Sequence, residues 1–103
     1  MWLIAGSNDC FYNTDKIKRL YWESEKVWVD DLLSTEGYTV SLYADFGGNA
    51  EYLIGEWFGE GDVRDGEKRV LDEMSRIFTD MTVGKAYHRI ADTRYEEAKE
   101  MQK

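Results

Sequence analysis

The sequence of 103 residues has no proline, one cysteine and no long hydrophobic run. Its apolar segments are shorter than the roughly 20 residues that cross a bilayer, and its N-terminus lacks the basic-then-apolar pattern of a secretion signal. The single cysteine, Cys10, excludes a framework of internal disulfides and suits a reducing compartment. We therefore expect a cytoplasmic protein.

Basic side chains are scarce in the middle of the chain. Residues 23–67 contain twelve acidic side chains against Lys26 and Arg64, a net charge of −10. The flanking segments 1–22 and 68–103 each carry +1, so the middle accounts for the whole net charge of −8. A nucleic-acid-binding protein needs positive charge to neutralise phosphates, so direct binding to nucleic acid is not expected.

Hydrophobic and aromatic residues are plentiful by comparison. The chain is 43% hydrophobic and includes four Trp, seven Tyr and four Phe. This length and composition predict one ordered domain over residues 1–103, with a single core.

The segment 38–46 has the clearest strand pattern, because apolar and polar residues alternate along it. Gly47-Gly48 then offers a two-residue hairpin turn. A second strand after this turn would pair with the first in the register Leu42 with Leu53, Val40 with Gly55 and Tyr38 with Trp57. This register directs Leu53 and Trp57 to the core and Glu56 to solvent.

A helix from about Asp65 to Met81 is predicted next, with Asp62 or Asp65 as its N-terminal cap. Its apolar stripe consists of Val70, Leu71, Met74, Ile77, Phe78 and Met81. We expect Leu71, Met74 and Phe78 to be buried against the sheet.

A second helix is predicted from Lys85 to about Met101. Its stripe consists of Tyr87, Ile90, Ala91, Tyr95, Ala98 and Met101. One small sheet does not need this second stripe, so residues 85–101 are expected to pack against a second copy of the chain as a homodimer.

The N-terminal third is less regular. Trp2–Ala5 and Cys10–Tyr12 flank a polar segment, Gly6–Asp9, and predict a hairpin. Residues 16–33 leave two alternatives open, since their apolar spacing favours a helix whereas Ile17–Trp22 also suits a strand.

Several short motifs resemble a family of small proteins from Firmicutes and their phages that begin "MWI" and continue with an "LGEY" strand and an "ALEVLDEI" helix. The matching residues are Met1-Trp2-Leu3, Asp15-Lys16-Ile17, Leu53-Ile54-Gly55-Glu56-Trp57 and Val70-Leu71-Asp72-Glu73-Met74. The resemblance covers roughly residues 1–81 and implies a strand over residues 16–22. The chain departs from the family at Trp57, around residues 23–36 and from Thr82 onward. No activity is known for the family that could be transferred.

Together these patterns predict an α+β fold, in which an antiparallel sheet of four or five strands is followed by two C-terminal helices. Residues 1–62 are expected to be mainly β and residues 63–103 helical.

No segment carries a recognisable catalytic or metal-binding motif. "EGDVRDGEKRVL" fails as a calcium loop because Arg64 falls at a ligand position and Leu71 replaces the closing Glu. His88, the only histidine, has Asp92 one helical turn away but no nucleophile at a useful spacing. Neither an enzyme nor a cofactor is predicted, although carboxylates that meet only in space are invisible to sequence patterns.

The acidic segment instead predicts a protein-binding surface. Carboxylates would steer the chain toward a basic partner, and aromatic residues would anchor it. The candidate contact residues are Glu51, Glu56, Phe58, Glu60, Asp62 and Asp65, and the carboxylates among them are expected to lie together near the end of the strand carrying Trp57.

Small acidic phage proteins such as anti-CRISPR proteins are similar in size and charge. The similarity implies an inhibitor that occupies the basic nucleic-acid site of a host defence nuclease, in the host cytoplasm if a phage encodes it. The alternative is a cytoplasmic regulatory module with another protein target.

Overall fold

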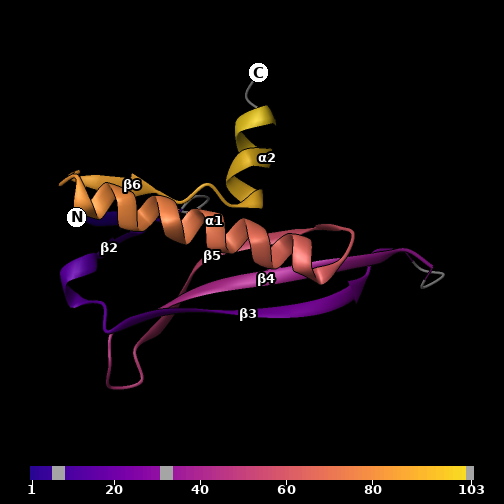
Figure 1. Cartoon of the computed structure of the whole chain (residues 1–103), viewed down its shortest axis with the longest axis horizontal. Coiled ribbons are helices and arrows are strands. Elements are labelled where there is room, and N and C mark those ends of the chain that lie inside the picture. Colours follow the sequence, from indigo (N-terminus) through magenta and orange to yellow (C-terminus); the bar gives the residue numbers. More distant parts are fainter. Residues whose placement is uncertain (6–8, 31–33, 102–103) are drawn as a thin grey trace.

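The computed structural model describes residues 1–5, 9–30 and 34–101, and it confirms the α+β class (Figure 1). The described elements are β1 (Trp2–Ile4), β2 (Phe11–Asn13), the short 3-10 helix η1 (Thr14–Lys16), β3 (Arg19–Trp28), β4 (Glu36–Asp45), β5 (Glu51–Glu60), α1 (Val63–Thr82), β6 (Tyr87–Arg89) and α2 (Thr93–Met101). Figure 1 shows α1 running along β3–β5 and on to β6, while α2 projects away from the strands.

The described strands form two sheets of three, not one sheet of four or five. The larger sheet is antiparallel in the order β3-β4-β5. In the smaller sheet, β2-β1-β6, the central strand β1 is antiparallel to β2 and parallel to β6. The prediction of a single antiparallel sheet was wrong because β6, from the segment expected to be helical, returns to pair with the N-terminus.

The N-terminal third is extended. β1 and β2 pair with Leu3 opposite Tyr12, which confirms the predicted hairpin strands, while residues 6–8 of the turn lie outside the described residues. β3 confirms the strand alternative for residues 19–22 and continues to Trp28. The helical periodicity of this segment did not decide its structure, because all of β3 pairs with β4.

β4 and β5 form the predicted hairpin but in a different register. Val40 lies opposite Trp57 and Leu42 opposite Gly55, and a bulge at Ile54 separates these pairs from the pairs nearer the turn. The turn is longer than two residues, since the Phe46 N–H donates to the Ala50 carbonyl at 2.8 Å. Trp57 is buried as predicted, but the bulge turns Leu53 to the exposed face.

α1 begins at its predicted cap, because the Asp62 side chain accepts a hydrogen bond from the Arg64 N–H. Val70 and Ile77 are fully buried, whereas Leu71 and Phe78 are 50% and 56% exposed. The prediction that Leu71 and Phe78 are buried was therefore wrong. The apolar stripe is wide enough for either of its sides to face the sheet. In the structure the side that carries Val70 and Ile77 does so.

The predicted helix from Lys85 to Met101 is divided into β6 and α2. Ile90, between them, is fully buried in the core with Leu3, Leu42 and Trp57. The apolar residues of this segment therefore do not share one helical stripe, which removes the original reason for expecting a homodimer through residues 85–101. Dimerisation itself stays a prediction.

Candidate functional site

One face of the β3-β4-β5 sheet lies away from α1. The opposite face carries Val40 and Leu42 of β4, which are fully buried beneath the helix. Successive strand residues point to opposite faces, so Thr39, Ser41 and Tyr43 point to the face that α1 does not cover.

Cross-strand pairing places the side chains of this face in rows. From one end to the other, the central rows are Tyr21-Tyr43-Leu53, Glu23-Ser41-Glu56 and Glu25-Thr39-Phe58. We call the surface formed by Tyr21, Glu23, Glu25, Tyr43, Glu56 and Phe58 the acidic face.

Glu23 and Glu25 give the acidic face its charge. Both are exposed, and no basic side chain of the described residues forms an ion pair with either. They stand two positions apart on β3, about 7 Å by strand geometry. With Tyr43 they border a shallow hollow of about 290 Å³. Negative potential is therefore concentrated over one hollow and not spread evenly along the strands.

Aromatic rings lie beside these carboxylates. Tyr21 and Tyr43 are stacked, with ring centroids 5.2 Å apart and planes inclined by 18°. Phe58 is half-buried two strands away from Glu25. Rings held against a sheet lose little conformational freedom on binding, so they suit the anchoring part of a protein interface.

Glu56 and Phe58 are the two predicted contact residues that lie centrally on the acidic face. Glu56 is held by Arg94, with Oε1 3.0 Å from Nη2. Its charge is partly neutralised there, so Glu23 and Glu25 contribute more to the potential of this face.

The remaining predicted residues lie farther away. Glu51 and Glu60 are at opposite ends of β5, about 30 Å apart by strand geometry, and Glu51 lies 3.6 Å from Arg19. Asp62 caps α1, and the hydrogen bonds from Arg64 lower the pKa of Asp62 to about 2. Asp65 lies exposed in the first turn of α1. The prediction that these carboxylates form one cluster was wrong because Glu51 is a full strand length from Glu60, with Glu56 between them.

The sequence patterns did not single out Glu23 and Glu25, which lie at the centre of the acidic face. Their spacing of two on a strand was the available signal, but it depended on choosing the strand alternative for residues beyond Trp22. A helix would have separated them by 200° around its axis.

His88 occupies a second polar site, beneath α1. The sequence spacing placed His88 one helical turn from Asp92. His88 instead lies on β6 and not on a helix, so the two do not pair. Its Nδ1 is 2.5 Å from Asp80 Oδ2 and its Nε2 is 2.5 Å from Glu73 Oε1. The hydrogen bond to Glu73 is the main cause that raises the pKa of His88, and burial opposes it. Within the described ranges, no group of three His, Cys, Asp or Glu side chains is arranged to hold a metal ion.

Asp92 has a structural role at the edge of the sheet. Its Oδ2 accepts a hydrogen bond from the Glu56 N–H at 3.0 Å, and its Oδ1 accepts one from the Tyr95 N–H at 2.9 Å. The neighbouring Thr93 hydroxyl accepts from the Phe58 N–H at 3.1 Å. These side chains satisfy the free edge of β5 and cap α2 at the same time.

Comparison of the chain with protein-family models, with curated proteins and with solved structures found no match. Neither of the two described α-helices is long and apolar enough to span a membrane.

Proposed function

We propose that the protein is a non-enzymatic inhibitor whose acidic face docks in the basic nucleic-acid-binding cleft of a host defence nuclease. One observation carries the proposal: Glu23 and Glu25 are free of ion pairs among the described residues and border stacked aromatic rings on a face that α1 leaves uncovered.

The two kinds of residue on this face suit two stages of binding. Exposed carboxylates attract a basic surface over about 8 Å at physiological ionic strength, which raises the association rate. The rings of Tyr21, Tyr43 and Phe58 supply apolar area that excludes water once contact is made, which slows dissociation. Trp57 has no such role, because it is 2% exposed on the opposite face.

Displacement of DNA from a panel of bacterial defence nucleases tests the proposal. Fluorescence anisotropy of a labelled duplex would report the release of DNA as the protein is added. We expect displacement by the wild type, weakened by added salt and reduced about tenfold or more in the double variant Glu23→Lys/Glu25→Lys.

A matched control has the same change in net charge elsewhere. Asp72 and Glu97 are exposed on α1 and α2 and lie off the acidic face. The double variant Asp72→Lys/Glu97→Lys should displace DNA as well as the wild type does. Equal loss in both double variants would show a general charge effect and no specific site. If no nuclease in the panel releases DNA, the inhibitor proposal is wrong.

On a nuclease that releases DNA, binding kinetics can distinguish the carboxylates, which affect association, from the aromatic rings, which affect dissociation. Charge reversal at Glu23 and Glu25 should mainly slow association, whereas Phe58→Ala should mainly speed dissociation. A nuclease that binds the acidic face without releasing DNA would support the alternative of a regulatory module.

A further inference from the structure

The two edge strands of the β3-β4-β5 sheet differ in whether their outward backbone groups have hydrogen-bond partners. The side chains of Asp92 and Thr93 accept hydrogen bonds from the outward N–H groups of Glu56 and Phe58 on β5. On the opposite edge, no strand of the described residues pairs with β3 on the side away from β4.

The register shows which backbone groups of β3 point away from β4. The Val29 N–H donates to the Thr35 carbonyl at 3.0 Å, and hydrogen-bonded pairs alternate along an antiparallel ladder. The odd-numbered residues of β3 therefore bond to β4, and Leu20, Trp22 and Ser24 direct their N–H and carbonyl groups to the free edge. No described residue hydrogen-bonds to these groups.

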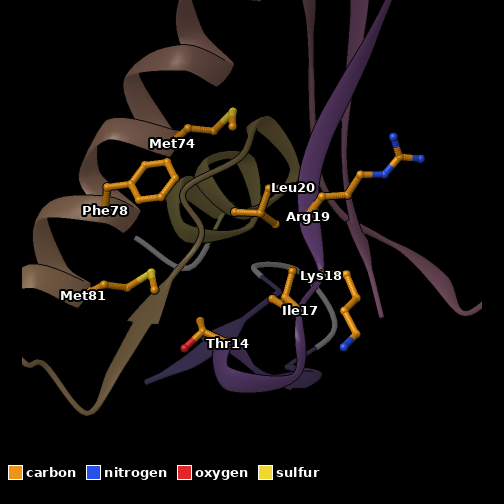
Figure 2. Close-up of a pocket in the computed structure, with 8 residues that line it drawn as sticks. All are labelled: Thr14, Ile17, Lys18, Arg19, Leu20, Met74, Phe78 and Met81. Carbon is orange, nitrogen blue, oxygen red and sulfur yellow. The ribbon is translucent and has the colours of Figure 1, made fainter. Parts of the chain in front are cut away.

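An apolar groove lies beside this free edge, between β3 and α1. Figure 2 shows Met74, Phe78 and Met81 of α1 and Ile17 and Leu20 of the β3 side pointing into the same space. We call this space the edge groove; its volume is about 230 Å³, and Thr14, Lys18 and Arg19 complete its lining. Phe78 and Met81 remain 56% and 42% exposed there, so the groove is open to a partner.

The two ends of the edge groove differ in charge. Farther along β3 toward Trp28, the Ser24 hydroxyl donates a hydrogen bond to Glu67 Oε2 at 3.3 Å, which links β3 to α1. Toward the start of β3, the charged residues of the lining are Lys18 and Arg19, and no acidic residue lines the groove. Arg19 is neutralised by Asp45 and Glu51, but Lys18 has no acidic partner among the described residues.

We propose that the edge groove binds an extended segment of a partner protein, which adds a strand to the free edge of β3. The unpaired backbone of Leu20 and Trp22 would bond to the main chain of the segment, and every second side chain of the segment would enter the groove against Met74 and Phe78. These inserted side chains should be apolar. An acidic residue of the segment should lie beside Lys18.

An extended segment fits this site better than a helix does. A helix satisfies its own backbone and would leave the edge of β3 unpaired, whereas an added strand uses both the edge and the groove. The flexible side chains of Met74 and Met81 can adapt to different apolar residues. This site lies along the α1 side of the sheet, so it is separate from the acidic face and does not depend on the proposed function.

A library of random octapeptides displayed on phage tests the proposal. The library would be selected on the wild-type chain and depleted on the variant Phe78→Glu. We expect enriched peptides with apolar residues at alternating positions and an acidic residue toward one end. No enrichment, or apolar residues spaced by three and four as on a helix, would overturn the proposal.

Two measurements on an enriched synthetic peptide then locate its contacts. Hydrogen exchange followed by NMR should slow at the amides of Leu20 and Trp22, while Tyr21, already bonded to β4, serves as the internal reference. N-methylation of the peptide amides that face β3 should weaken binding about tenfold or more, because each lost hydrogen bond leaves a carbonyl of β3 unpaired. Unchanged exchange at Leu20 and Trp22 would contradict strand addition.

The control variant is Leu71→Glu. Leu71 is exposed on α1 to a similar extent as Phe78 but does not line the edge groove. It should bind the peptide as the wild type does, whereas Phe78→Glu should lose at least about tenfold in affinity. Thermal melts would check that both variants fold. If the wild type instead self-associates in sedimentation and excludes the peptide, a second copy of the chain occupies the edge, and the partner proposal is wrong.

Discussion

Glu73 and His88 lie 2.5 Å apart, Oε1 to Nε2, although α1 and β6 carry them 15 residues apart in the chain. Glu73 is 1% exposed and His88 9% exposed. The other ring nitrogen of His88 lies equally close to Asp80, so both nitrogens face carboxylates. A neutral imidazole has one N–H and cannot donate to both, so this arrangement favours the imidazolium ion. Protonated His88 therefore ties β6 to α1.

The first prediction is a loss of stability as the pH rises. The pKa of His88 is raised above the value of about 6.5 in the unfolded chain, so the folded state holds the proton more tightly. The stabilisation is fully present below about pH 6.5 and disappears as the pH rises through the folded pKa. Urea titrations between about pH 6 and pH 9 should therefore give a falling free energy of unfolding.

The control for this pH dependence is His88→Gln, which has no proton to lose. Arg76 and Lys85 also face the site, through their ion pairs with Glu73 and Asp80 respectively. The variant should be less stable than the wild type at pH 6 but nearly independent of pH. A wild type and a variant with parallel pH profiles would show that His88 is not the titrating group.

The second prediction concerns the face of α1 that is buried. Ile77 is fully buried, so Ile77→Ala should lower the free energy of unfolding by about 2 to 5 kcal/mol. Phe78→Ala, at an exposed position one residue later, should cost less than about 1 kcal/mol. Denaturant titration of both variants compares them directly, and the reverse order would mean that α1 is rotated on the sheet.

The third prediction concerns Gly66, where α1 lies close against β4. A Cβ on Gly66 would lie 2.4 Å from Tyr38 Cδ2 and 2.7 Å from Val40 Cγ2. Gly→Ala in an exposed helix usually stabilises by about 1 kcal/mol, but here the methyl group would push the helix from the sheet. Gly66→Ala should destabilise by about 1 to 3 kcal/mol in a urea titration. An increase in stability would contradict the close approach.

The fourth prediction concerns the edge of β5. Asp92→Ala removes the acceptor for the N–H groups of Glu56 and Tyr95, at a cost of about 2 kcal/mol. Hydrogen exchange at the Glu56 amide should become faster, while Trp57, which faces β4, should change only with global stability. Asp92→Asn keeps one acceptor oxygen, so its exchange rate at the Glu56 amide should lie between those of the wild type and Asp92→Ala. Unchanged exchange at Glu56 would show that Asp92 does not protect this edge.

Local patterns predicted the parts of the fold that local forces decide. The alternation over 38–46 succeeded because one face of β4 is fully buried, and the start of α1 was predictable because Asp62 caps it. The register of β5 was not, because the bulge at Ile54 serves the packing of the core and leaves no turn signal in the sequence. The side of α1 that is buried could not be predicted either, since Val70 and Leu71 are equally apolar.

The candidate site was predicted only in part, because its geometry depends on pairing between segments that are distant in the sequence. Charge and aromatic content drew attention to residues 23–67, but the positions of their side chains depend on strand pairing. Glu23 and Glu56 come together across Ser41, and no spacing along the chain relates them. No spacing along the chain relates Glu73 and Asp80 to His88, which lies on a strand that pairs with β1.

The parallel pairing of β1 with β6 also determines when the fold can be completed. Trp2 lies opposite Tyr87, 85 residues away in the chain, whereas β2, the other neighbour of β1, follows it closely in the sequence. Such distant pairings form slowly, and until then the apolar surface of Leu3 has no cover from β6. Until β6 has paired with β1, the partly folded chain therefore exposes apolar surface and is prone to aggregation.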